Sequence, residues 1–125
     1  MNGYLVSGEI ILLTIGAGHS YLGERFIFKP LFAGPDLPGL LGSRSFMKNT
    51  LRFAWHITTA LLFGLAVLLG LAARAADVGP LRPSLLCVAG ALLACAILAG
   101  VLSRLKHFAW ALFLAAAVLV ALGAR

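Results

Sequence analysis

Long apolar runs separated by short polar segments dominate the chain. Four runs contain almost no charged residues: Gly3 to Gly18, which includes Glu9, then Phe53 to Ala73, Leu85 to Ser103, and Phe108 to Ala124. Each is about 16 to 21 residues long, close to the ~17–25 residues with which a helix crosses a bilayer core of ~30 Å. A span in lipid must satisfy its backbone hydrogen bonds internally, and no period-two alternation indicates a barrel, so the runs predict helices.

Composition supports the same fold class. Of 125 residues, 62% are hydrophobic and 11% are charged, and the mean hydropathy is +1.03, which is outside the range of soluble domains. We therefore expect a single all-α domain over residues 1–125, a polytopic membrane protein built as a four-helix transmembrane bundle. The predicted spans are about 3–23, 51–73, 84–103 and 107–124.

The segment between the first two predicted spans is both polar and apolar. We expect an interfacial cytoplasmic loop over about 24–48, because apolar side chains alternate there with prolines and glycines. Pro30, Pro35 and Pro38 disfavour a continuous helix. Ser43 and Ser45 are candidate N-caps for a helix that runs directly into the second span.

Basic residues gather on one side of the predicted bundle. With four spans, both termini share one face, and residues 19–52 and 103–107 share the other. Seven basic residues on the second face oppose three on the first: Arg25, Lys29, Arg44, Lys48, Arg52, Arg104 and Lys106 against Arg74, Arg82 and Arg125. The positive-inside rule then makes the polar loops cytoplasmic and places both termini outside.

This asymmetry also bears on location and partners. We expect an integral protein of the inner (plasma) membrane of a bacterium, with the lipid bilayer as its partner. Membrane topology and anionic headgroups explain most of the net charge of +6. Nucleic-acid binding is therefore not expected.

One face of the first predicted span is polar or small. At 100° per residue, Glu9, Gly16, Ser20 and Gly23 lie within about 40° of one line. Gly16, Ser20 and Gly23 are predicted helix-packing positions, because small residues four apart let transmembrane helices approach closely. Glu9 then points into the bundle, where it is a candidate proton or cation site. Alternatively, Glu9 reaches the headgroup region or accepts a hydrogen bond from a neighbouring helix.

Polar side chains gather at the predicted cytoplasmic ends of the spans. His19 ends the first span, His56 opens the second and His107 opens the fourth, and Glu24 and Arg52 lie near the same depth. These five residues are the candidate ligand- or metal-binding set. Imidazole and carboxylate groups suit zinc or iron, and two histidines suit the axial positions of a haem. No pair has a metal-binding spacing, so the cofactor stays unknown. The alternative is a structural hydrogen-bond network with Glu24 balancing an arginine.

The candidate residues are consistent with three functions. The first is a small integral membrane protein whose polar His/Glu/Arg site at the cytoplasmic end binds a metal, a haem or a small anionic ligand. The second is a proton-coupled transporter that uses Glu9. The third is a structural or assembly subunit, either as a homo-oligomer or within a larger membrane complex. No catalytic residue is identified and enzymatic activity stays open, because Ser20 beside His19 lacks the base and third residue that a serine nucleophile needs.

Overall fold

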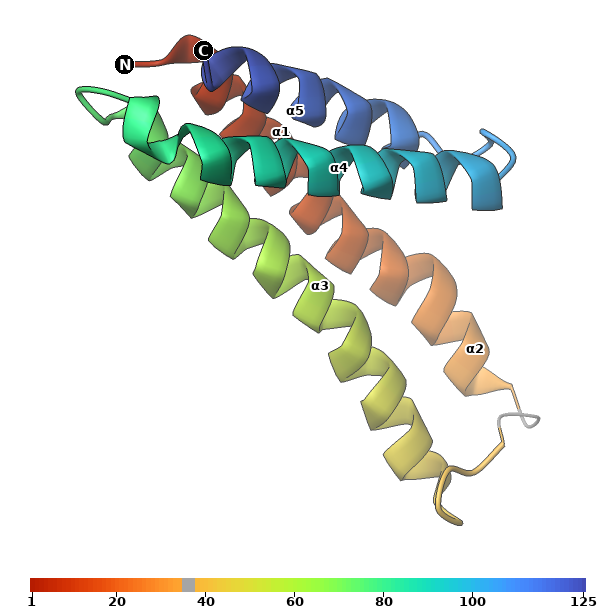
Figure 1. The fold of residues 1–125 in the computed structure, drawn as a ribbon. Helices are drawn as coiled ribbons and strands as arrows, with labels where there is room; N and C mark the ends of the chain where they lie inside the picture. The colour runs from red at the N-terminus through yellow and green to blue at the C-terminus, as the bar shows by residue number, and fades with distance from the viewer. Residues whose placement is uncertain (35–37) are drawn as a thin grey trace.

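The computed structural model describes residues 1–34 and 38–125, and within them the chain forms helices joined by short turns (Figure 1). The elements in chain order are α1 (Gly3–Leu22), the π-helix η1 (Gly23–Phe28), α2 (Lys29–Ala33), α3 (Arg44–Ala73), the 3-10 turn η2 (Gly79–Leu81), α4 (Arg82–Leu102) and α5 (Ala109–Gly123). The described residues contain no β-strand, only one isolated bridge between Leu40 and Ser43. The predicted all-α class is confirmed.

Three helical segments are long and apolar enough to cross a membrane: Gly3–Ala33, Arg44–Ala73 and Gly79–Leu102. The fourth, Ala109–Gly123, is apolar but has only 15 residues. At ~1.5 Å per residue it is about 22 Å long, shorter than the ~30 Å core of a bilayer. The sequence therefore located all four helices, and the last one falls below the usual span length.

The loop expected over about 24–48 differs from what is observed at both of its ends. The first helix continues without a break through η1 and α2 to Ala33, and α3 begins already at Arg44. Pro30 is accommodated because the turns before it are π-helical, with the Lys29 amide donating to the Glu24 carbonyl. This wider turn relieves the clash that a proline ring makes in an α-helix. Pro35 lies outside the described residues.

Ser43 caps the long third helix, as its position predicts. Its backbone is extended (φ −123°, ψ 121°) and its side chain accepts a hydrogen bond from the Phe46 amide at 3.2 Å. This bond satisfies one of the free amides in the first turn. The helix then runs for 30 residues without interruption.

The helices form two hairpins (Figure 1). The segment from α1 to α2 runs antiparallel to α3, and α4 runs antiparallel to α5. The hairpins join mainly through α1 and α5. They lie together near the two termini, here called the terminal end, and diverge toward their own loops. We call the tip of the α1–α3 hairpin, residues 19–34 and 38–59, the loop end.

The core lies where the two hairpins meet. The largest fully buried side chains are Leu5, Leu12, Leu69 and Val120, which come from three different helices. Asn2 ties the same helices together: its side chain accepts from the amides of Tyr4 and Leu5 and donates to the Gly123 carbonyl at 2.8 Å, and its amide donates to the Ala73 carbonyl at 2.8 Å. The terminal end is thereby held rigid, and the loop end of the α1–α3 hairpin extends away from it.

Candidate functional site at the loop end

The sequence-predicted polar residues converge on one carboxylate. Arg52 donates two hydrogen bonds to Glu24, from Nε to Oε1 at 2.7 Å and from Nη2 to Oε2 at 3.1 Å. His56 Nε2 lies 3.0 Å from the same Oε1. Arg52 and His56 are one turn apart on α3, so both side chains face η1, which carries Glu24. Three of the five candidate residues therefore form one group.

The network continues inward from His56 to two hydroxyl groups. Ser20 Oγ lies 2.8 Å from His56 Nδ1 and 2.8 Å from Thr59 Oγ1. With the proton of His56 on Nε2, toward the carboxylate, Nδ1 accepts from Ser20, which in turn accepts from Thr59. Thr59 is buried, with 6% of its surface exposed. A single chain of hydrogen bonds therefore connects an exposed ion pair to the interior of the hairpin.

His19 lies beside this network but has partners of its own. Its ring stacks on Trp55 with centroids 4.1 Å apart and planes at 4°. Its Nε2 lies 2.9 Å from Thr58 Oγ1, and the Trp55 indole donates to the His19 carbonyl at 3.0 Å. The indole in turn sits on Gly23, where an added Cβ would lie 2.6 Å from Trp55 Cε2. His19 thus helps to hold α1 against α3.

Small residues on α1 pack against aromatic rings of α3. Gly23 faces Trp55, and at Gly16 an added Cβ would lie 3.0 Å from Phe63 Cδ1. Ser20, between them, bonds His56 and Thr59 instead of serving only as a small packing residue. This role of Ser20 was not predicted from the sequence. Its position four residues before Glu24, on the same helix face, was the available signal.

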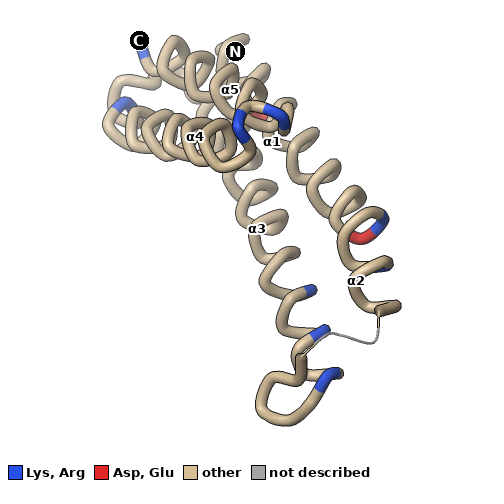
Figure 2. The backbone as a smooth tube through the Cα atoms, turned by 90° about the vertical axis from the view of Figure 1, so that its right-hand side faces the viewer, with Lys and Arg blue, Asp and Glu red and all other residues tan. Residues whose placement is uncertain are grey.

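Basic side chains on α3 form a row along the hairpin. Lys48, Arg52 and His56 recur every four residues, and Figure 2 shows Lys and Arg positions along the tip of α3. Lys48 Nζ donates to the Phe32 carbonyl at 2.8 Å. The Phe32 ring lies under both cations, 5.6 Å from Lys48 Nζ and 5.3 Å from Arg52 Cζ. Glu24 is the only acid paired with this row among the described residues.

His107 takes no part in these contacts. It lies exposed in the turn between α4 and α5, where its Nδ1 accepts a hydrogen bond from the Ala109 amide at 3.2 Å and its own amide donates to Ser103 Oγ at 3.2 Å. These local bonds satisfy free backbone groups at the start of α5. Within the described residues, no hydrogen bond joins His107 to the group around Glu24.

These donors are arranged as hydrogen-bonding groups rather than as a set of metal ligands. No group of three or more His, Cys, Asp or Glu side chains that could hold a metal ion occurs in the described parts of the chain. Both ring nitrogens of His56 already have partners, and His19 Nε2 is within hydrogen-bond distance of Thr58. Ligation would break the contacts that hold α1 to α3.

Ser20, His56 and Glu24 have the order of a serine, a base and an acid, which invites comparison with a hydrolytic triad. Ser20 lies inside α1, however, so the surrounding backbone amides are engaged in helix hydrogen bonds. They cannot form the oxyanion hole that supplies most of the rate enhancement in acyl transfer. The arrangement is therefore a hydrogen-bond network rather than a nucleophilic site.

Glu9 lies far from this network. Its carboxyl group packs against Gly70 on α3, where an added Cβ would lie 2.7 Å from Glu9 Cδ, and Arg74 donates to the Gly70 carbonyl. Glu9 makes no hydrogen bond or ion pair within residues 1–34 and 38–125. Eleven residues separate Glu9 from Ser20, about 16 Å along a helix, and the contact of Gly16 with Phe63 lies between them.

Comparison of the chain with protein-family models, curated proteins and solved structures found no match. The geometry of the loop end is therefore the basis for a functional assignment.

Proposed function

We propose that the protein is an integral protein of the bacterial inner membrane, a four-helix transmembrane bundle with both termini outside, that binds a small anionic ligand at the cytoplasmic loop end. Three helices of suitable length and composition support the membrane location. Large apolar side chains also cover outward faces, including Leu61 and Leu68 on α3 and Leu98 and Leu102 on α4. Such surfaces suit lipid and are rare on soluble monomers.

The length of the first hairpin supports a position for the site just outside the hydrocarbon. Gly3–Ala33 has 31 residues and Arg44–Ala73 has 30, about 45 Å of helix each, against a core of ~30 Å. Trp55 and Trp110 then mark the interface at which tryptophans are enriched. In this placement Glu24, Arg52 and Lys48 face the cytoplasm.

The observation that carries the assignment is the excess of positive charge on Lys48 and Arg52, which face one carboxylate, Glu24, beside the His56 imidazole. Like charges four residues apart on a helix repel, and here Lys48 and Arg52 also share one aromatic ring. An additional anion would relieve this repulsion. A metal or a haem is a less suitable ligand, because both ring nitrogens of His56 and Nε2 of His19 already have protein partners.

Arg52 is the residue best placed to receive that anion. It uses Nε and Nη2 on Glu24, and its Nη1 has no hydrogen bond with any described residue. Its side chain is 46% exposed. A planar guanidinium presents paired N–H groups that match a carboxylate or a phosphate. We expect the ligand to be a small carboxylate or phosphate that binds the outer edge of Arg52.

Calorimetric titration of the protein in nanodiscs of zwitterionic lipid tests this function, with inorganic phosphate and citrate as probes and chloride as the reference salt. We expect saturable binding that Arg52→Gln abolishes. Arg52→Lys should weaken binding, because lysine keeps the charge but lacks the paired N–H groups of the guanidinium. Arg25→Gln is the matched control: it removes the same charge from the same end, and Arg25 makes no hydrogen bond or ion pair with the row within the described residues. Binding that is absent from the wild type, or reduced equally by Arg52→Gln and Arg25→Gln, would refute the proposal.

A second candidate function is proton-coupled transport through Glu9. The observation in its favour is that this half-buried carboxylate has no partner among the described residues, although it lies in an apolar helix interface. Intramembrane acids of this kind mark proton sites. In proteoliposomes with an imposed pH gradient, Glu9→Gln would abolish proton flux while Ser7→Ala would not. Flux that persists in Glu9→Gln would end this candidate.

A further inference from the structure

The turn after α4 places a charged residue in a conformation that usually belongs to glycine. The Leu105 amide donates to the Gly100 carbonyl at 2.8 Å and the Arg104 amide to the Val101 carbonyl at 3.1 Å, which is the Schellman arrangement. Arg104 occupies the left-handed position with φ of 51°, and Leu105 follows with φ of 61°. A side chain with a Cβ is disfavoured there, and such outliers gather at functional sites.

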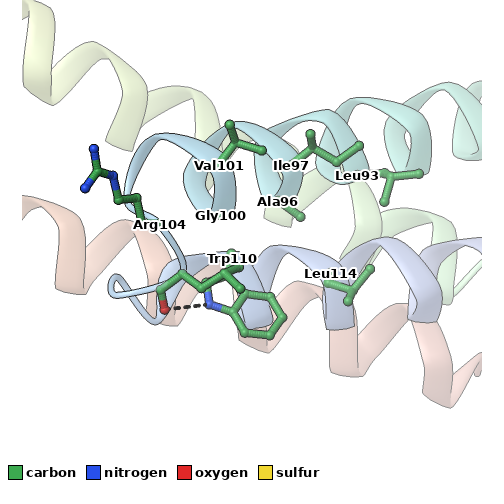
Figure 3. A pocket seen from close by; sticks show the side chains of 9 residues that line it. Leu93, Ala96, Ile97, Gly100, Val101, Arg104, Trp110 and Leu114 are labelled. Carbon is green, nitrogen blue, oxygen red and sulfur yellow. Dashed lines mark hydrogen bonds between the residues drawn. The ribbon is translucent and has the colours of Figure 1, made fainter.

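Arg104 stands at one end of an apolar groove between α4 and α5 (Figure 3). The groove has a volume of about 510 Å³, within the ~300–1,000 Å³ range of small-molecule sites. Its walls include Leu93, Ile97, Val101, Trp110 and Leu114. Two small residues of α4, Ala96 and Gly100, also line it.

The groove is lined by apolar side chains, except for one charged residue at its end. Arg104 is the only ionisable residue that lines it, and Arg104 forms no ion pair within the described residues. Trp110, whose indole donates to the Leu105 carbonyl at 3.3 Å, holds the turn at the same end. The groove is therefore apolar and has one cation at its end, at the membrane depth where an interfacial tryptophan is expected.

We propose that this groove binds one acyl chain of an anionic phospholipid, whose phosphate pairs with Arg104. The proposal rests on the membrane location proposed above but not on the anion site of α3. A free phosphate would not use the apolar walls, and a purely apolar partner helix would not use Arg104. The adjacent Lys106 does not line the groove, although it carries the same charge in the same turn.

Fluorescence quenching of Trp110 tests this site. The protein is reconstituted in bilayers that contain phosphatidylglycerol or phosphatidylcholine with brominated acyl chains, and the Trp110 signal is the difference between wild type and Trp110→Phe, so Trp55 stays in place. We expect brominated phosphatidylglycerol to quench Trp110 at about a fivefold lower mole fraction than brominated phosphatidylcholine, the selectivity that one interfacial cation provides. Arg104→Gln removes the preference, and Lys106→Gln retains it.

A further variant separates lipid binding from folding. Arg104→Gly relieves the left-handed strain, so we expect a higher unfolding temperature together with loss of the preference for the anionic lipid. Equal quenching by the two lipids in the wild type, or equal effects of Lys106→Gln and Arg104→Gln, would overturn the proposal. Absence of quenching by either lipid would also overturn it and would indicate that a second copy of the chain covers the groove.

Discussion

Arg52 and Glu24 join the two long helices of the first hairpin through a paired hydrogen bond, with distances of 2.7 Å and 3.1 Å, although 28 residues separate them in the chain. Glu24 also accepts from His56, so one carboxylate organises two donors from successive turns of α3. We expect the register between η1 and α3 to depend on this contact. The other polar contact across the described hairpin beyond residue 23 joins Lys48 to the Phe32 carbonyl of α2.

Glu24→Gln should loosen the loop end without unfolding the terminal end. The amide keeps the shape of the side chain but removes the charge that Arg52 and His56 share, and charge-assisted hydrogen bonds weaken when one partner is neutral. We expect faster amide hydrogen exchange over residues 44–59, with exchange near Leu5 and Leu69 unchanged, measured in detergent by mass spectrometry. Asp77→Asn, in the turn before η2, serves as the control. Exchange that rises uniformly along the chain would contradict this local role.

Gly23→Ala should destabilise the hairpin by overpacking. The new methyl group would lie 2.6 Å from Trp55 Cε2, and Trp55 is held from the other side by the His19 ring. Overpacking of this kind costs about 1–3 kcal/mol. Gly18→Ala is the matched control, because nothing lies within 4 Å of its added methyl group. Denaturant titration in micelles should show a loss for the first variant only, and equal stability of the two would disprove the packing assignment.

Gly70→Ala should be harmful because of Glu9, and the effect should disappear when Glu9 is shortened. The added methyl group would lie 2.7 Å from Glu9 Cδ, at the end of a flexible side chain that can move aside, so we expect a loss of less than about 1 kcal/mol in unfolding free energy. In a double-mutant cycle, Glu9→Ala should restore most of that loss. Gly64→Ala on the same helix, with open space around it, should be neutral. Additive effects of Gly70→Ala and Glu9→Ala would show that the two residues do not interact.

Removal of metal ions should leave the protein unchanged. Both ring nitrogens of His56 and Nε2 of His19 have protein partners, and the described residues contain no group of three metal-ligating side chains. We expect a colourless, metal-free protein from mild detergent, with the same unfolding temperature with and without a chelator. A stoichiometric metal, or a haem absorption band that disappears in the His19→Ala/His56→Ala double variant, would reverse the assignment of the loop end.

Local patterns in the sequence were sufficient for the helices and several of their ends. The apolar runs located four helices, and Ser43 marked the start of α3 because capping depends on a few neighbouring residues. The helix break predicted at Pro30 was wrong, because the π-helical turns of η1 accommodate the proline. No local sequence pattern predicted the left-handed backbone of the consecutive residues Arg104 and Leu105.

The sequence by itself determined that polar residues gather near the ends of the apolar helices, since hydropathy and the 100° periodicity are properties of single segments. Only the tertiary structure decided which of them meet. Ser20 and Glu24 face Arg52 and His56 because Phe63 on Gly16 and Trp55 on Gly23 set how closely α1 approaches α3. His107 instead makes its hydrogen bonds within its own turn, to Ser103 and Ala109. Pairing across helices depends on the relative rotation, register and angle of the helices, and these come from packing between segments that no single stretch of sequence contains.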